Sequence, residues 1–411
     1  MNKPALQHRP ETEFTVDSDN LIFAGKSLLQ LAQLAGQTPF YAYSRSLMTE
    51  RVRQLRRNMP DDLKIHYAIK ANPMPAVVQH MANIVDGLDV ASANEMLVAL
   101  DTGMRAENIS MAGPGKRPLE LLQAIAAGIT IHVESMQELE TIAGQCEQSG
   151  QTAHIAIRIN PAFELKSSGM KMGGGAKQFG IDEERVPSAL QRIEELRLDF
   201  KGFHIFSGSQ NLKPEAIIEA QQKSIALAVR LSDICPAPIL KLNIGGGFGI
   251  PYFPGEMPLD SKRIGEALAE SMLSARDNIP EAEIIIELGR YLVGEAGLYV
   301  TRIIDKKISR GQTFLVTDGG LNHHLAASGN FGQVIRKNYP VAIGNKMACP
   351  EMETVNIVGP LCTPLDILAD KMELPRAEIG DLVVIFQSGA YGFTASPRDF
   401  LNQPGALQLL L

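Results

Sequence analysis

Residues 65–73 read Ile-His-Tyr-Ala-Ile-Lys-Ala-Asn-Pro, a mostly apolar run that ends in a polar turn. A short apolar run bounded by turn residues is typical of a strand buried in a parallel sheet. An amphipathic stretch, 75–82, comes next, and a second apolar run, 85–90, follows it. This order of strand, helix and strand predicts parallel strands with helices outside the sheet.

The same alternation continues to residue 287. The expected strands are Ile65–Ile69, Val85–Val90, Ile109–Ala112, Ile129–Val133, His154–Ile159, Gly202–Phe206, Leu240–Ile244 and Ile284–Glu287. Eight strands separated by helices over about 250 residues fit a (β/α)8 TIM-like barrel better than an open sheet. We therefore expect an α/β barrel domain over residues 38–287.

The pattern changes after residue 287, where short apolar runs follow one another without long helical stretches. These runs are Leu298–Ile304, Thr313–Thr317, Val355–Val358 and Leu382–Phe386, and Thr15–Phe23 resembles them. Strands without intervening helices indicate antiparallel pairing. Residues 1–37 and 288–411 are therefore expected to form a second, mostly antiparallel β domain.

Composition excludes several classes of function. The 411 residues carry a net charge of -7, which argues against nucleic acid or an anionic membrane as the main partner. No apolar run approaches the ~20 residues of a membrane helix, and the N-terminal segment lacks the apolar core of a signal peptide. The 4 cysteines contain no C-x-x-C pair, which favours a reduced, cytoplasmic protein without a zinc site or disulfides.

Lys70 directly follows the first expected strand, and catalytic groups of such barrels lie at strand carboxyl ends. Burial there would lower its pKa and free the neutral amine that Schiff-base formation with an aldehyde needs. A lysine that extends into solvent is the commoner structural explanation. Asp89, Arg158, His204 and Glu287 fall at other strand ends, which strengthens the catalytic interpretation.

Two glycine-containing turns are candidates for binding a phosphate. Gly245-Gly246-Gly247-Phe248-Gly249 follows the strand 240–244, and Ser207-Gly208-Ser209 follows the preceding strand. Consecutive glycines let backbone N–H groups approach an anion without obstruction by side chains. A tight turn with no ligand is the alternative explanation.

Later motifs offer further chemistry. Glu287 lies in Glu-Leu-Gly-Arg, and a carboxylate buried there needs a partner such as a protonated pyridine nitrogen or an arginine. Tyr391 could donate to a phosphate, although packing at a turn is more common. Cys362 lies beside Asp366 in a turn-rich loop and is a candidate proton donor, although most free cysteines are inert. The adjacent His323 and His324 lack a third ligand at a useful spacing, so no metal site is expected.

In combination these motifs resemble the fold-type III pyridoxal-phosphate decarboxylases, the diaminopimelate, ornithine and arginine decarboxylases with an alanine-racemase-like barrel. The motifs that carry the resemblance are Tyr-Ala-Ile-Lys-Ala-Asn (67–72), Asp-Val-Ala-Ser (89–92), Arg-Ile-Asn-Pro (158–161), Gly-Ser-Gln (208–210), Gly-Gly-Gly-Phe-Gly (245–249), Glu-x-Gly-Arg (287–290) and Gly-Pro-x-Cys (359–362). The stretches 169–175, 325–332 and 394–397 resemble a subgroup found with exosortase and exopolysaccharide gene clusters.

The resemblance implies decarboxylation at the α-carbon of an amino-acid-like substrate. Lys70 would hold pyridoxal 5'-phosphate as a Schiff base, Glu287 would keep its ring nitrogen protonated, and Asp89 and Arg158 would support the Lys70 end. Cys362, from the other subunit of a homodimer, would return a proton to the carbanion. The residues implied to bind the phosphate are Ser209, Gly245, Gly246, Gly247, Gly289, Arg290 and Tyr391, and those implied to contact the substrate are Arg290, Thr363 and Tyr391.

Three positions depart from the amine-forming members of that family. Phe206 occupies the place of the histidine that stacks on the cofactor ring, so Phe206 is expected to stack there; the alternative is that His204 shifts to do so. Thr363 replaces an acidic residue that recognises a distal amino group, and Ala326-Ala327 replaces an Arg-Pro pair. Free diaminopimelate, lysine and ornithine are therefore disfavoured, because their distal ammonium would lose water without gaining a partner.

Charged loop residues suggest an anionic or extended amino acid, linked to a carrier protein or nucleotide. These residues are Lys166, Lys171, Lys177, His323, His324 and Arg336, and ordinary solvated loop charges are the alternative explanation. A racemase or epimerase on the same barrel and a non-catalytic cofactor-binding regulator are the competing functions. The regulator resembles a lone barrel, whereas this chain has a second domain with a candidate acid.

Overall fold

The computed structural model describes the chain except for residues 1–7, 10–13, 164–169, 172 and 334–335, and it gives no side-chain surroundings for 170 and 171. Contacts within the chain divide it into two compact units. One comprises Thr49–Ile250 and Pro258–Tyr291, and the other comprises Met1–Met48, Pro251–Met257 and Leu292–Leu411. The two units are described separately below.

The unit that contains Lys70 is a closed barrel of parallel strands. Its strands are β5 (Lys64–Ala68), β6 (Gly87–Val90), β7 (Ile109–Met111), β8 (Thr130–Val133), β9 (His154–Asn160), β12 (Asp199–Ile205), β14 (Lys241–Gly246) and β15 (Glu283–Leu288). They pair in the order β9-β12-β14-β15-β5-β6-β7-β8, and β8 pairs with β9 to close the ring. The short strand β11 (Ile181–Asp182) adds to β9. All eight expected strands are confirmed, with boundaries that differ by at most a few residues.

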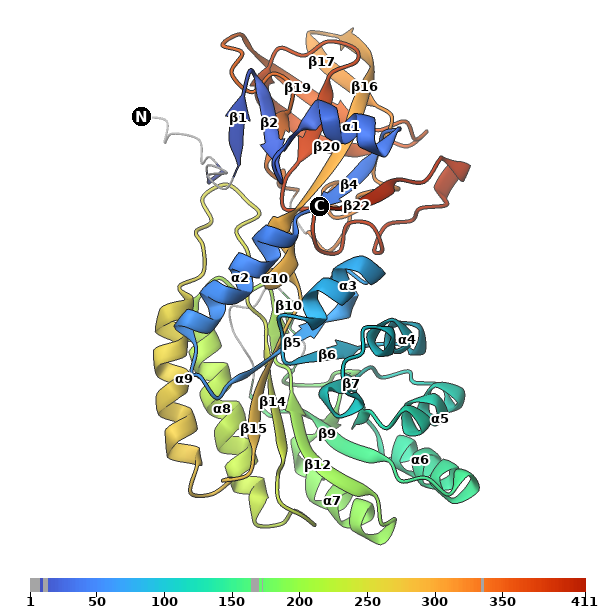
Figure 1. The fold of residues 1–411 in the computed structure, drawn as a ribbon, viewed down its shortest axis with the longest axis vertical. Helices are drawn as coiled ribbons and strands as arrows, with labels where there is room; N and C mark the ends of the chain where they lie inside the picture. The colour runs from blue at the N-terminus through green and yellow to red at the C-terminus, as the bar shows by residue number, and fades with distance from the viewer. Residues whose placement is uncertain (1–7, 10–13, 164–169, 172, 334–335) are drawn as a thin grey trace. The chain divides into compact units, whose positions relative to one another are not determined.

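Helices alternate with these strands and cover the outside of the barrel (Figure 1). They are α2 (Arg45–Asn58), α3 (Pro75–Ala82), α4 (Ala93–Asp101), α5 (Pro118–Ala127), α6 (Met136–Ser149), α7 (Val186–Glu195), α8 (Pro214–Ser232) and α9 (Ser261–Ala275). Local sequence explains where several begin. Ser92 and Ser135 cap α4 and α6, because their hydroxyls accept from the N–H groups of Glu95 and Glu138, each at 3.2 Å.

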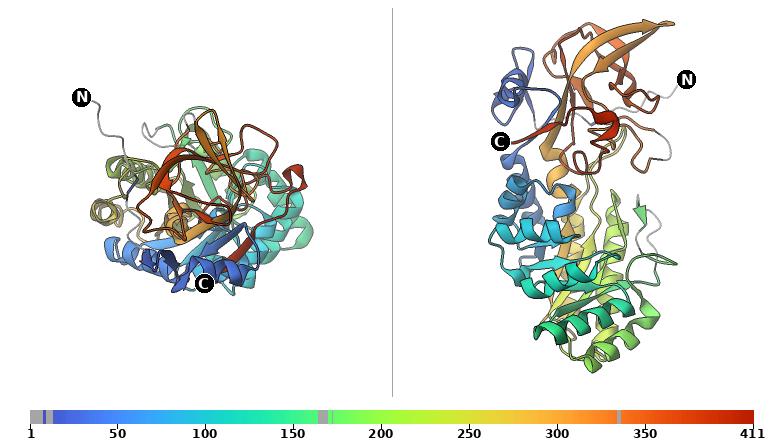
Figure 2. Two further views of the ribbon diagram at one scale, coloured as in Figure 1. Left: turned by 90° about the horizontal axis from the view of Figure 1, so that it is seen from above. Right: turned by 90° about the vertical axis from the view of Figure 1, so that its right-hand side faces the viewer.

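The second unit is built on a mostly antiparallel sheet with the order β18-β21-β16-β17-β19-β20. Its strands are β16 (Gly297–Ser309), β17 (Gln312–Thr317), β18 (Val341–Ile343), β19 (Met352–Val358), β20 (Ile367–Pro375) and β21 (Leu382–Ile385). Figure 2 shows the long strand β16 in orange within this unit. The N-terminal strands β1 (Thr15–Asp17), β2 (Asn20–Phe23) and β3 (Lys26–Ser27) form a small separate sheet that leads into helix α1 (Leu28–Ala35). The predicted antiparallel β domain is confirmed.

One strand inside the predicted barrel range belongs to the other unit. Phe40–Tyr43 falls inside the predicted barrel range, 38–287, but forms strand β4, which pairs antiparallel with β16 and parallel with β22 (Leu407–Leu410). All four β4 residues are buried, so the strand has no polar face that would indicate its sheet. An apolar run of this kind cannot be assigned to a particular sheet from periodicity. The segment Pro251–Met257, also inside that range, belongs to the second unit as well.

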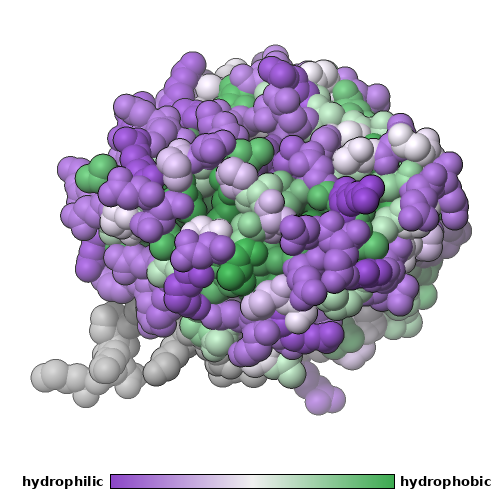
Figure 3. Space-filling view, turned by 90° about the horizontal axis from the view of Figure 1, so that it is seen from below, coloured by the Kyte–Doolittle hydropathy of each residue, from purple (hydrophilic) through white to green (hydrophobic). Residues whose placement is uncertain are grey.

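Hydrophilic side chains cover much of the face seen in Figure 3, while hydrophobic ones gather nearer its middle. Within the part of the chain that the structure describes, no helix has the length and apolar character needed to cross a membrane.

Candidate active site

The carboxyl ends of β5 and β15 bring Lys70 and Glu287 together. These strands are parallel neighbours in which Glu287 pairs with His66, and the chain leaves β5 through a single 3-10 turn that carries Lys70. Lys70 Nζ lies 3.3 Å from Glu287 Oε1. The Lys70 side chain is 44% exposed, so the expected burial of its amine is wrong. A side chain at the mouth of a barrel reaches solvent even when its strand is buried.

Glu287 is a buried carboxylate that keeps its charge. Burial would raise its pKa, but the Lys70 ammonium, His204 and Arg158 together hold that pKa well below its ordinary value. A buried anion at the end of a barrel strand, with an amine in reach, can pair with a cationic group of a ligand. This is the property that the ring nitrogen of pyridoxal phosphate requires.

Two histidines lie behind Glu287. His204 Nε2, at the end of β12, is 3.2 Å from Glu287 Oε2, an ion-pair distance, although the angle is outside hydrogen-bond geometry. The ring of His132, from β8, lies 4.4 Å from the ring of His204 between centroids. Both rings are buried. His132 was not among the residues expected from sequence, because nothing in its local sequence separates it from an ordinary core residue.

Phe206 occupies the position that faces Lys70. Lys70 Nζ lies 5.8 Å from the centroid of the Phe206 ring, while His204 points to Glu287 instead. This geometry favours Phe206 over His204 as the ring that would stack under a cofactor bonded to Lys70. An apolar ring offers stacking area without a group that titrates near neutral pH.

Asp89 and Arg158 each bind a partner that sequence did not identify. Asp89 Oδ1 accepts a hydrogen bond from Ser110 and lies 3.2 Å from His66 Nδ1. Asp89 Oδ2 is buried without a hydrogen-bond partner among the described residues. Arg158 Nη1 donates to Glu134 Oε1 at 2.8 Å.

Glu134 also accepts from the backbone N–H groups of Gly113 at 2.6 Å and Gly180 at 3.1 Å. Arg158 and Glu134 therefore tie together the loops that follow three strands of the barrel, β7, β8 and β9. Arg158 also acts near Lys70, because its charge helps to lower the pKa of Glu287.

The glycine turn after β14 has little room for side chains. A Cβ atom at Gly247 would lie 2.4 Å from the carbonyl oxygen of Gly208, and the Gly247 φ of +73° also disfavours other residues. The two glycine-containing turns therefore pack against each other. The N–H of Gly245 donates to Asn243 Oδ1 at 2.8 Å. The Gly245 N–H is therefore already used within the protein. We expect Gly245 to permit the tight turn rather than to donate a hydrogen bond to a phosphate.

The residues at this end of the barrel fit pyridoxal phosphate. Ser209 Oγ is buried without a hydrogen-bond partner among the described residues, next to the backbone turn at Gly247. A buried hydroxyl without a partner needs a ligand or water. Lys70 supplies an amine and Glu287 a buried anion within one site. Gly289 and Arg290 follow β15 directly, and Arg290 begins the short helix α10 (Arg290–Val293).

The remaining predicted site residues, Cys362, Thr363 and Tyr391, belong to the second unit. Cys362 is exposed in the loop between β19 and β20. Asp366 closes this loop, because its buried carboxylate accepts from the N–H groups of Leu361 at 2.8 Å and Leu321 at 2.6 Å. The backbone of Tyr391 has a φ of +55°, and its ring lies 6.4 Å from that of Phe331.

Three of the six loop charges proposed to select an anionic substrate are engaged elsewhere. His323 contacts the Pro404 carbonyl at 2.7 Å, His324 contacts Ser388 Oγ at 2.9 Å, and Arg336 donates to the Ser328 carbonyl. The buried His323 and His324 are therefore structural in this unit, which corrects their assignment to substrate. Lys166 lies outside the described residues, as does the side chain of Lys171.

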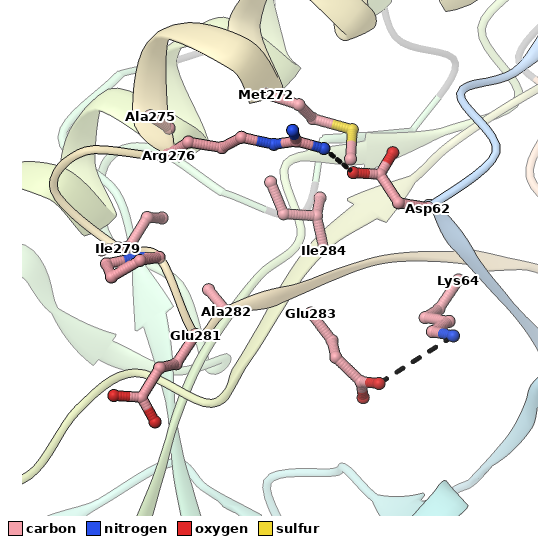
Figure 4. A pocket seen from close by; sticks show the side chains of 11 residues that line it. Asp62, Lys64, Met272, Ala275, Arg276, Ile279, Glu281, Ala282, Glu283 and Ile284 are labelled. Atoms are coloured by element: carbon pink, nitrogen blue, oxygen red, sulfur yellow. Dashed lines mark hydrogen bonds and ion pairs between the residues drawn. The ribbon is translucent and has the colours of Figure 1, made fainter.

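A hollow lies at the other end of the barrel. Its volume is about 520 Å³, and it is lined by the starts of β5 and β15 together with the end of α9 (Figure 4). Arg276 and Asp62 pair there at 2.7 Å, and Lys64 and Glu283 lie 3.9 Å apart. These two ion pairs use four of the charged side chains of the hollow, and Lys70 and Glu287 lie at the opposite ends of these strands. This hollow is therefore not the candidate active site.

Among the described residues no cluster of side chains that could hold a metal ion is present.

Comparison with known proteins places the site in context. Residues 45–294 match the family model described as the pyridoxal-binding domain of pyridoxal-dependent decarboxylases. The chain is 38% identical over 380 residues to L-glutamyl-[BtrI acyl-carrier protein] decarboxylase of Niallia circulans, which covers 91% of this chain and 89% of that protein. It is 29% identical to 2-[(L-alanin-3-ylcarbamoyl)methyl]-2-hydroxybutanedioate decarboxylase of Staphylococcus aureus, over 89% of this chain and 92% of that one. Diaminopimelate decarboxylase of M. jannaschii has a similar solved structure, with a TM-score of 0.87 at 26% identity over 97% of this chain and 93% of that chain.

Proposed function

The chain belongs to the pyridoxal-dependent decarboxylases, and we propose that it removes the α-carboxyl group of an amino acid that is linked to a larger carrier. Membership of this family supplies the reaction class and the cofactor, pyridoxal 5'-phosphate. The roles of individual residues and the identity of the substrate form the proposal.

Each residue at the barrel mouth has a role that follows from its surroundings. Bound pyridoxal phosphate supplies a sink for the electron pair left on the α-carbon when carbon dioxide departs. Lys70 carries the cofactor on its amine. Glu287, kept anionic by its neighbours, pairs with the protonated ring nitrogen. Phe206 packs against the ring, and Ser209 with the backbone at Gly246 and Gly247 holds the phosphate.

The proton balance requires an acid. Loss of carbon dioxide leaves an electron pair on the α-carbon, and a proton must replace the carboxyl group there to give the amine. Cys362 is an exposed thiol in a loop whose shape Asp366 maintains. We assign Cys362 of a second copy of the chain as this acid, on the basis of the family resemblance. A loop cysteine can approach one face of the substrate and so return the proton with defined stereochemistry.

The proposal for the substrate rests on two replacements, Thr363 in place of an acidic residue and Ala326-Ala327 in place of an Arg-Pro pair. Thr363 offers a hydroxyl that accepts from the Leu365 N–H at 3.3 Å, where the family scheme has an acid. Ala326 and Ala327 are buried apolar residues. A free diamino acid would lose water from its distal ammonium here without gaining a carboxylate. An amino acid whose distal group is already joined to a carrier does not incur this cost, and the Niallia circulans relative acts on such a substrate.

The test compares release of carbon dioxide from two kinds of substrate by the protein loaded with pyridoxal phosphate. We expect kcat/KM for L-glutamyl acyl-carrier protein to exceed that for free diaminopimelate, ornithine or lysine by at least about hundredfold, because unpaired charges impose penalties of this order. Equal or faster turnover of free diaminopimelate would refute the carrier proposal and favour the activity of the M. jannaschii relative. Exchange of the α-proton without release of carbon dioxide would instead identify a racemase.

A further inference from the structure

The chain of contacts His132–His204–Glu287 lies in the interior of the barrel, one layer behind the proposed cofactor position. Glu287 has two carboxylate oxygens with different partners: Oε1 is 3.3 Å from Lys70 Nζ, and Oε2 is 3.2 Å from His204 Nε2. The side chains of Glu287 and His204 are 5% and 2% exposed. Once the Lys70 amine binds a cofactor, it no longer contacts Oε1. The carboxylate is then oriented by its contact at Oε2.

Packing alone does not explain either histidine. The Nδ1 atoms of His132 and His204 are both buried without a hydrogen-bond partner among the described residues. A buried polar atom without a partner is destabilising, and an apolar side chain would fill the same space without that cost. Burial and the nearby His204 also hold the pKa of His132 well below its ordinary value, so His132 stays neutral at pH 7. Buried residues that destabilise the core next to a proposed site need a functional explanation.

The geometry supplies one. His132 and His204 come from β8 and β12, which both pair with β9, and their rings lie 4.4 Å apart at an angle of 44°. This contact restricts rotation of the His204 ring, so that Nε2 points to Glu287. The other charged groups that act on this pair are Arg158 of β9 and Lys116. Arg158 is bound to Glu134 and Lys116 to Glu138, whereas His204 Nε2 lies 3.2 Å from Oε2.

We propose that His204 is a positioning residue that holds Glu287 Oε2, leaving Oε1 for the ring nitrogen of the cofactor, and that His132 keeps His204 in this orientation. This inference rests on the proposed role of Glu287. It adds two residues to the control of ring protonation, and it involves no covalent step. His204 acts through Glu287 and does not itself touch the reacting atoms.

The test measures the dissociation constant of pyridoxal phosphate and the pH dependence of the absorbance of the bound cofactor. His204→Leu is expected to weaken cofactor binding by about tenfold to hundredfold and to lower the apparent pKa of the bound ring, because the 3.2 Å contact of His204 Nε2 with the buried carboxylate is lost. His204→Gln, which keeps a donor, should restore most of both properties. His132→Leu should produce a smaller change in the same direction.

A double-mutant cycle separates this role from a general effect on folding. In a Glu287→Gln background, His204→Leu should have no further effect on cofactor affinity or on the absorbance titration. His154→Leu is the matched control, because His154 also pairs with a carboxylate, Asp199, at 2.7 Å but lies at the start of β9, away from the site. That variant should bind the cofactor as the parent protein does.

Equal effects of His204→Leu in both backgrounds would overturn the inference, and so would an unchanged affinity in the single variant. If His204→Leu does not fold, the comparison of His132→Leu with the parent in both backgrounds decides the same question, because His132 is proposed to act through His204 and Glu287. The result can be told apart from failure of the proposed function. A protein that releases carbon dioxide normally but shows no coupling between His204 and Glu287 contradicts only this inference, whereas a protein without cofactor bound at Lys70 contradicts the assignment of the site.

Discussion

Replacement of Gly247 by alanine tests whether the glycine turn after β14 holds the cofactor phosphate. The new Cβ atom would lie 2.4 Å from the carbonyl oxygen of Gly208, about 1 Å short of ordinary van der Waals contact. Both partners of this contact are backbone, so no flexible side chain can move aside. The two turns must separate, and the separation changes the positions of the N–H groups proposed to bind the phosphate.

Two costs of this change can be separated. The φ of Gly247 is +73°, and alanine in that region costs about 1–2 kcal/mol of folding free energy whatever its surroundings. The steric displacement adds a functional cost, because a shift of about 1 Å at a binding site can reduce its efficiency by about a hundredfold. Gly128, the residue that ends helix α5, has a φ of +71° and nothing within 4 Å of a Cβ atom. Gly128→Ala therefore carries only the first cost.

The assay is titration of each apoprotein with pyridoxal phosphate, together with thermal unfolding. Both variants should lose a few degrees of melting temperature, since about 1 kcal/mol corresponds to roughly 2–4 °C for a unit of this size. Only Gly247→Ala should bind the cofactor more weakly, by about a hundredfold. Equal affinities in Gly247→Ala and Gly128→Ala would show that the turn does not contribute to phosphate binding.

Three further outcomes are expected. Lys70→Ala should leave no cofactor that borohydride can attach to the chain, and covalent trapping in that variant would refute Lys70 as the linking residue. Cys362→Ala should lower kcat by about 10²–10⁴-fold with little change in cofactor affinity. Cys235→Ala should have no effect, because Cys235 follows α8 at the end of the barrel opposite Lys70; equal activities of the two variants would exclude Cys362 as the acid. Burial lowers the pKa of His324 from 6.5 to about 3, so its contribution to stability is complete above pH 6.5 and decreases as the pH falls towards 3. At pH 5.5 about 1 kcal/mol should be lost, and His324→Gln should flatten this part of the stability profile; parallel profiles would contradict the assignment.

Local sequence was sufficient to predict the elements that carry the site. Each barrel strand is a short apolar run ended by turn residues, and Lys70, His204 and Glu287 all follow or end such runs. Because parallel strands in a closed barrel share one carboxyl end, these residues could be assigned to one site before any coordinates were known. The glycines at 245–247 were likewise recognisable, since few other residues tolerate such a turn.

The contacts between residues from different strands required the tertiary structure. His132 and His66 resemble ordinary core residues in sequence. Pairing of β5 with β6 brings His66 against Asp89, and the pairing of β9 with both β8 and β12 brings His132 against His204. The exposure of Lys70 likewise depended on where its turn reaches the barrel mouth.

Sequence by itself determined the barrel, the second β domain and the residue types of the site, because these depend on periodicity and on turn chemistry within short segments. Tertiary structure decided that β4 joins the sheet of β16, and that His204 faces Glu287 while Phe206 faces Lys70. The physical reason is that strand pairing and side-chain contacts join segments that are far apart in the chain. A local sequence pattern does not show which of these contacts has the most favourable free energy.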